Sequence, residues 1–180
     1  EFDQAGKILR NISFVDLLYD NGLHALLFPT GRPEVGSIYE DPIHLNDVEE
    51  LYPEAADSFS LFNSGDVLIS ARNLNLILVF NPETKKVIWY QTGPFLRQHD
   101  VDFQPNGTIT VFNNNTDETS GNRFGGSNIL EIEPESRSAR IKYRAPKFYS
   151  RTQGEHQILS DGRMVVAEST RGRVFMVDEQ

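Results

Sequence analysis

One sequence pattern recurs along the chain, and a recurring pattern constrains the fold more than any single motif does. Its three copies occupy residues 43–93, 98–145 and 155–180. Each copy begins with an apolar segment headed by a histidine and continues through a glycine turn into a second apolar segment. A third apolar segment follows, and in the first two copies there is a fourth, "KVIWYQ" and "ARIKYR".

This repeat predicts an all-β fold. Short apolar segments separated by Gly, Asn and Asp turns are typical of antiparallel strands joined by tight hairpins. Four such strands per unit are the pattern of a β-propeller blade. We therefore expect one propeller portion with whole blades at 43–93 and 98–145 and an incomplete blade at 155–180. Residues 1–14 are expected to end a preceding blade, and residues 15–42 to form an irregular or degenerate segment.

Composition excludes several partners and chemistries. The net charge of the 180 residues is −9, which argues against binding to nucleic acid or to an anionic membrane surface. The chain has no apolar run of about 18 residues, so no membrane insertion is expected. It has no cysteine, which excludes disulfides, thiolate metal sites and cysteine nucleophiles. Because closed propellers have about four to eight blades, we expect either further blades or an oligomeric partner.

Three of the four histidines fall at corresponding places in the repeat. His44, His99 and His156 each head the first segment of a copy, at spacings of 55 and 57 residues. The first strand of each blade lines the channel of a propeller, so the three imidazoles are expected to meet near its axis. Neighbours on a strand point to opposite faces, so Asp100 should not share a face with His99, whereas Asn46 can share one with His44. Structural histidines that bind a neighbouring turn are the alternative.

Arginine side chains could complete an oxyanion site beside these histidines. Arg72, in "LISARN", lies on the second predicted strand of the first copy, near the axis by the same geometry. Its fork of donors suits a sulfate or phosphate oxygen, although an ion pair between blades is equally open. Arg123, in the loop "SGNRFGGSN", is a second candidate.

These segments, in this order, resemble a known family. "HLNDVEEL", "GDVLISARNLNLILVFNPETKKVIW" and "GPFLRQHDVDFQPNGTITVFNNN" are similar to the bacterial-type arylsulfotransferases, as are "NILEIEP", "EHQILSDGRMVVAEST" and "GRVFMVDE". The resemblance covers roughly residues 43–180. It implies a six-bladed propeller that moves a sulfuryl group from an aryl sulfate to a phenol through a sulfated histidine. It implies no nucleotide donor, no other cofactor and no metal, and a periplasmic or extracellular location.

The resemblance also implies residue roles. His99 in "QHD" matches the nucleophilic histidine, while His44 and Arg72 match the groups that hold the sulfuryl oxygens. A further family histidine, from an earlier blade, has no counterpart here unless His24 serves. The expected substrate-binding residues are His156, Arg123 and Asn46.

Other functions stay open at this point. "NPETKKVIWYQTG" resembles the docking motif of quinoprotein (PQQ) propellers, but the second copy reads "EPESRSARIKY", so Trp89 is expected to pack between blades. A non-catalytic propeller that serves as a scaffold or binding surface is the main alternative, because a fold does not settle chemistry. The loop at 113–122 could hold calcium, but its spacing matches no EF-hand, so a polar hairpin loop is the favoured interpretation. Met164 and Met176 lie on predicted strands and are expected in the core.

Overall fold

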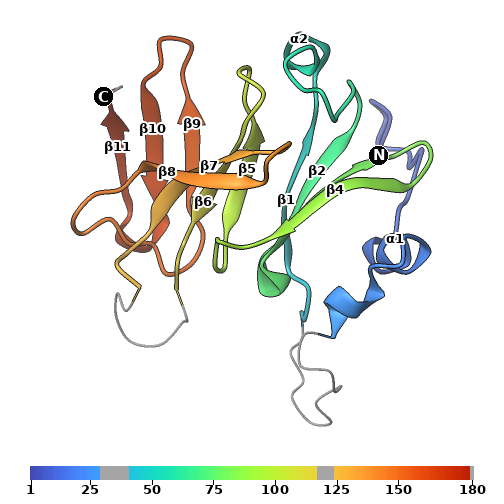
Figure 1. Ribbon diagram of the computed structural model, residues 1–180, viewed down its shortest axis with the longest axis horizontal. Helices are drawn as coiled ribbons and strands as arrows, with labels where there is room; N and C mark the ends of the chain where they lie inside the picture. Colours follow the sequence, from blue (N-terminus) through green and yellow to red (C-terminus); the bar gives the residue numbers. More distant parts are fainter. Residues whose placement is uncertain (29–40, 117–123, 179–180) are drawn as a thin grey trace.

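Three antiparallel sheets follow one another along the chain. The computed structural model describes residues 1–28, 41–116 and 124–178. Figure 1 shows the sheets side by side, with the N-terminus at one side of the molecule and the C-terminus at the other. The predicted all-β class and its four-stranded antiparallel units are confirmed, and within the described residues the sheets do not close into a ring.

The first two sheets have four strands each, in sequential order. The first contains β1 (Leu45–Glu50), β2 (Val67–Ala71), β3 (Leu76–Asn81) and β4 (Lys86–Thr92). The second contains β5 (His99–Phe103), β6 (Ile109–Asn113), β7 (Asn128–Glu133) and β8 (Ser138–Tyr143). A short helix, α2 (Pro53–Ala56), lies between β1 and β2, and the 3-10 turn η2 (Arg72–Leu74) follows β2.

The third sheet has three strands in the described residues. They are β9 (Glu155–Ile158), β10 (Met164–Glu168) and β11 (Arg173–Val177), with the 3-10 turn η3 (Ser169–Arg171) before the last. The two 3-10 turns occupy the same place in their sheets, and each ends in a left-handed residue, Asn75 or Gly172. The repeat in the sequence is therefore also a repeat of turn geometry.

The N-terminal segment covers one face of the first sheet. Phe2 and Ile8 form an isolated antiparallel bridge. The helix α1 (Phe14–Asp20) follows, with the Ser13 side chain accepting a hydrogen bond from its first turn, and then the 3-10 helix η1 (His24–Leu27). The buried side chains of α1 pack against apolar residues of β2 and β3. Residues 29–40 of the predicted irregular segment lie outside the described residues.

The apolar core lies between adjacent sheets. One cluster joins the first sheet to the second, and another joins the second to the third. Trp89 is 3% exposed and donates its indole N–H to the carbonyl of Pro134 at 3.0 Å, so it packs between sheets as predicted. Met164 is buried, as expected, but the core position predicted for Met176 is wrong. Met176 is 52% exposed because no described segment covers that face of β11.

Candidate active site

The first strands of the three sheets lie next to one another: β1 beside β5, and β5 beside β9. Because β1 and β2 are antiparallel, the end of β2 lies next to the start of β1. The backbone N–H of Arg72 accordingly donates to the carbonyl of His44 at 2.9 Å. The strand β2 also contacts β5, which begins at His99. This topology brings His44, Arg72 and His99 to one end of the inner strands.

His99 is half-buried, and its environment favours the neutral ring. Its Nδ1 lies 2.7 Å from Oδ1 of Asn114. The pKa of His99 is lowered from its ordinary value of 6.5, mainly by burial, and the positive charges of Arg72 and His44 add to this effect. Hydrogen bonds with the Asn114 side chain and the Arg97 backbone oppose it. A histidine with a lowered pKa is unprotonated at neutral pH, which a nucleophilic role requires.

Arg72 and a second arginine converge on one oxygen. Arg72 is 7% exposed and begins η2, one residue beyond the strand on which it was predicted to lie. Its Nη1 donates to Oδ1 of Asn73 at 2.8 Å, and Nη1 of Arg97 donates to the same oxygen. The backbone N–H of Arg97 is held in turn by Oδ1 of Asn75 at 2.8 Å. The two guanidinium groups therefore meet at Asn73, and the charge of Arg72 acts on His99.

The sequence analysis missed Arg97, although a signal for it exists. Arg97 lies 53 residues after His44, and both residues have left-handed backbones, with φ of 57° and 55°. The residue before each accepts an equivalent backbone hydrogen bond, Ile43 from Asn73 and Leu96 from Asn115, so Arg97 is the counterpart of His44 in the second sheet. Aligning the copies on the ends of their first strands, Glu50 and Phe103, rather than on histidine, would have identified it.

His44 is held outside the sheet by an acidic neighbour. Its side chain is 42% exposed, and its Nδ1 lies 2.9 Å from Oδ2 of Asp41. Its backbone N–H donates to the other carboxylate oxygen of Asp41 at 2.7 Å. His44 thus keeps one ring nitrogen bound to a carboxylate and has solvent access at the mouth of the site.

His156 does not join this group, and the expectation of three histidines in register is wrong. In the ladders, His156 pairs with Val166, which is the counterpart of Val111. Val111 pairs with Val101 and not with His99. The cause is that His156 lies two residues before Ile158, the end of β9, whereas His99 lies four residues before Phe103, the end of β5.

The surroundings of His156 are those of a structural residue. It is 3% exposed, its Nδ1 lies 2.5 Å from Oδ2 of Asp100, and its Nε2 lies 2.8 Å from Oγ1 of Thr110. Both ring nitrogens are therefore used inside the protein. Asp100 points to His156 and not to His99, which confirms that the His99–Asp100 pair is no dyad.

The whole chain, residues 1–180, matches the family model described as arylsulfotransferase (ASST). The chain belongs to the arylsulfotransferase family. This match supports a sulfotransferase-like function and extends the similarity to α1 and the N-terminal segment. No curated protein matches the chain.

Carboxylates of this arylsulfotransferase chain join the inner strands of its sheets. Asp47 and Glu49 on β1 accept hydrogen bonds from the backbone N–H groups of Val101, at 2.6 Å, and Phe103, at 2.5 Å. Asp100 on β5 accepts one from the backbone of β9 in the same way. Burial raises the pKa of Asp47 and raises that of Glu49 to about 7.

A second carboxylate on β5 completes this acidic group. Burial, with the charge of Asp100, raises the pKa of Asp102 to about 7. Ligand atoms of Asp100, Asp102 and His156 lie within 4.8 Å of one another, so they could reach one cation. The hydrogen bonds of His156 to Asp100 and Thr110 already account for this arrangement without one.

The remaining expected residues lie elsewhere in the arylsulfotransferase fold. Asn46 donates its Nδ2 to the carbonyl of Gln98 at 2.8 Å and so joins the first two sheets. The ring of His24 stacks on Tyr19 at 5.2 Å in the N-terminal segment. Arg123 and most of the loop considered for calcium, residues 117–122, lie outside the described residues.

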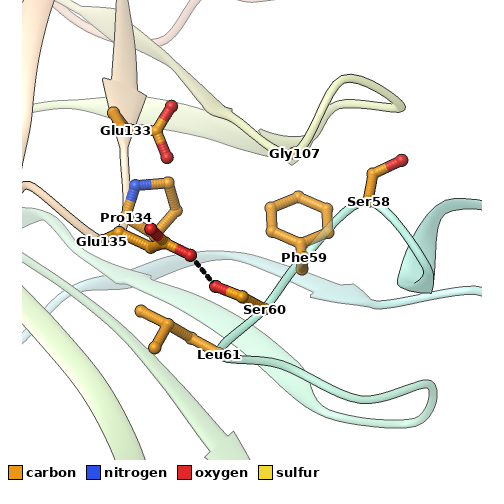
Figure 2. A pocket seen from close by; sticks show the side chains of 8 residues that line it. All are labelled: Ser58, Phe59, Ser60, Leu61, Gly107, Glu133, Pro134 and Glu135. Atoms are coloured by element: carbon orange, nitrogen blue, oxygen red, sulfur yellow. Dashed lines mark hydrogen bonds between the residues drawn. The ribbon is translucent and has the colours of Figure 1, made fainter.

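The small pocket in Figure 2 is not part of this site. It lies between the segment after α2 and the turns of the second sheet, and the Ser60 hydroxyl donates to Glu135 across it. Its volume of about 30 Å³ has room for about one water molecule. In the described part of the chain, no helix is long and apolar enough to cross a membrane.

Proposed function

We propose that this chain carries an aryl-sulfate sulfotransferase site in which His99 takes a sulfuryl group from an aryl sulfate and passes it to a phenol. The observation that carries the proposal is a half-buried histidine whose pKa is lowered by burial and by the charge of Arg72. A neutral imidazole can attack sulfur, and fixed cations can hold the sulfuryl oxygens. The family match supports the same reaction class.

The reaction is proposed to have two steps. In the first, a ring nitrogen of His99 forms a bond to sulfur while the bond from sulfur to the aryl oxygen breaks, and the phenolate leaves with the electron pair. In the second, the oxygen of an acceptor phenol attacks the same sulfur. The bond from nitrogen to sulfur then breaks, the ring regains its electron pair, and the phenolic proton is released. No cofactor is required.

We propose that cationic side chains near His99 bind the oxygens of the sulfuryl group. Arg72 is buried, so its charge acts in a medium of low dielectric constant. Its guanidinium is already in place and need not move as the sulfuryl group is transferred. Arg97 shares the acceptor oxygen of Asn73 with it and adds a second donor. His44, at the start of the first sheet's inner strand and 42% exposed, is proposed to contact the substrate.

We also propose that the chain works outside the cytoplasm, as the family suggests, and that further blades or a second copy complete the ring. Large apolar side chains are exposed on both outer faces: Val48 is 68% exposed on β1 and Val174 is 70% exposed on β11. Light scattering at several protein concentrations would show whether the 180-residue chain associates.

The experiment that tests the function follows nitrophenolate release from 4-nitrophenyl sulfate, with and without a phenol acceptor. We expect release that depends on the acceptor and that His99→Ala lowers by at least about a thousandfold. His24→Ala is the matched control, because His24 is exposed and stacks on Tyr19. A folded sample that releases nothing would contradict the proposal and favour the non-catalytic propeller.

A further inference from the structure

We propose that Asn114 holds His99 in a single tautomer, with hydrogen on Nδ1, so that Nε2 is the nitrogen available for chemistry. The assignment of the tautomer stands on hydrogen bonds alone. Its catalytic consequence, that sulfur bonds to Nε2, rests on the proposed function. Asn114 is therefore assigned as a positioning residue.

The amide of Asn114 is held in one orientation by hydrogen bonds at its nitrogen and at its oxygen. Asn114 follows β6 and is fully buried, at 0% exposure. Its Nδ2 donates to two backbone carbonyls, of Ser150 at 3.0 Å and of Gln153 at 2.7 Å. These bonds use both amide hydrogens. Turning the amide over would place Oδ1 against two carbonyl oxygens, so only one orientation is compatible with this pocket.

The orientation of the Asn114 amide determines which nitrogen of His99 carries hydrogen. With Nδ2 committed, Oδ1 of Asn114 faces Nδ1 of His99 at 2.7 Å. An amide oxygen has only lone pairs, so Nδ1 must carry the hydrogen of this bond. The neutral ring has one hydrogen, and its free electron pair is therefore on Nε2. The opposite tautomer would set two lone pairs against each other at a buried site.

The other groups around the ring of His99 do not compete with Asn114 for the hydrogen of Nδ1. Arg72 and His44 lower the pKa of His99, and a guanidinium group has no lone pair with which to accept the hydrogen of Nδ1. A hydrogen bond to the Arg97 backbone favours the protonated form of the ring. Among the described side chains, the one that hydrogen-bonds to the ring is Asn114, at Nδ1. The orienting group is thus the Asn114 amide.

The orientation depends on the third sheet as well as the second. Ser150 and Gln153 belong to the connection between β8 and β9, and the Ser127 hydroxyl ties this connection to Asn114 by donating to the Asn114 carbonyl at 3.0 Å. The backbone N–H of Ser150 donates to the same hydroxyl at 2.9 Å. The connection into the third sheet therefore determines which nitrogen of His99 is free.

The test is nitrogen NMR of protein labelled with ¹⁵N-histidine, recorded above the pKa of His99 and assigned by comparison with His99→Ala. In the wild-type protein we expect Nδ1 to be protonated and Nε2 to be unprotonated. In Asn114→Ala we expect a mixture of both tautomers and a kcat about ten- to a hundredfold lower. In Asn114→Asp the oxygen that faces Nδ1 remains, but the second oxygen lies against the carbonyls of Ser150 and Gln153, so we expect the Nδ1–H form to persist in a less stable protein.

The matched control is Asn115→Asp. Asn115 also donates its Nδ2 to two carbonyls, of Phe124 at 2.9 Å and of Gly126 at 3.0 Å, but it makes no hydrogen bond to His99. We expect the wild-type tautomer and activity within about twofold. A change of tautomer in this control equal to that in Asn114→Ala would overturn the inference.

The wild-type spectrum decides the inference even if Asn114→Ala fails to fold. Hydrogen on Nε2 in the wild-type protein would overturn it, whatever the activity. Hydrogen on Nδ1 without any sulfuryl transfer would support the tautomer assignment and contradict the proposed function, so the two failures are distinguishable.

Discussion

Gly107 and Gly65 hold corresponding turns of the first two sheets, but only Gly107 lies against a neighbouring chain segment. Both have left-handed backbones, with φ of 82° and 87°. A Cβ at Gly107 would lie 2.3 Å from the carbonyl oxygen of Ser58, whereas one at Gly65 would meet no atom within 4 Å. Figure 2 shows Gly107 opposite Ser58 at the pocket. The Gly65 turn therefore needs glycine for its backbone conformation alone, whereas the Gly107 turn also needs it for space.

We expect Gly107→Ala to lower the free energy of unfolding by about 1–3 kcal/mol more than Gly65→Ala does, because overpacking adds to the cost of the left-handed backbone. Urea denaturation of both variants measures the difference. Equal losses would show that the Ser58 segment moves aside without cost.

The charge of Arg72 acts on the ring of His99. Arg72 lowers the pKa of His99, so Arg72→Gln should raise it and increase the proton affinity of the ring by up to about tenfold. NMR titration of the His99 ring measures this change. Arg137→Gln is the control, because that guanidinium lies over the rings of Trp89 and Tyr90 instead. An unchanged titration in Arg72→Gln would mean that burial alone sets the pKa.

Among the secondary-structure elements, the inner strands are held together by carboxylates that bond to the backbone of the next strand. Glu49 reaches Phe103 in this way, and burial raises its pKa from an ordinary value of 4.5 to about 7. A raised pKa means that the folded state takes up a proton that the unfolded state releases. The contribution of Glu49 to stability is therefore present below about pH 4.5 and is lost as the pH rises to about 7.

Glu49→Gln should remove this dependence, because glutamine keeps an acceptor oxygen but cannot ionise. We expect the variant to be more stable than the wild-type protein at pH 8 and not at pH 5, as measured by thermal unfolding at both values. Glu50→Gln is the control, because Glu50 is exposed on the same strand. His99 acts in the opposite direction below its ordinary value of 6.5, so the comparison is between variants and not between pH values alone.

For the whole molecule, the candidate site depends on how the sheets are packed. Arg72 comes from the first sheet, His99 from the second, and the carbonyls that orient Asn114 from the connection to the third. Trp89 lies in the contact between the first two sheets and is the single tryptophan of the chain. Its fluorescence therefore reports whether these two sheets stay together.

We expect Trp89→Ala to cost about 3–5 kcal/mol of stability, because it leaves a cavity between the sheets and removes the hydrogen bond to Pro134. Ile88→Ala, a neighbouring residue that is 39% exposed, should cost much less. Denaturation followed by circular dichroism compares the two variants. A small loss in Trp89→Ala would mean that the sheets are held together mainly elsewhere.

The fold class and the positions of the strands follow from the amino-acid sequence, because turn residues and strand alternation are local features. Glycine, asparagine and aspartate mark the hairpins, and apolar segments such as "LILVF" at 76–80 form strands without regard to distant partners. The similarity of several segments to one family also selected His99, Arg72 and His44, which the structure brings to one end of the inner strands.

The register of the sheets and the partners of the side chains depend on how distant segments pack in three dimensions. His156 heads its copy of the repeat just as His99 does, yet the two lie at different distances from the ends of β9 and β5 and so fall on different rungs. The roles of Arg97 and Asn114 likewise depend on atoms of residues that are 24 or more positions away. Hydrogen-bond partners across packed sheets are long-range, and local sequence does not encode which of two neighbouring rungs they will share.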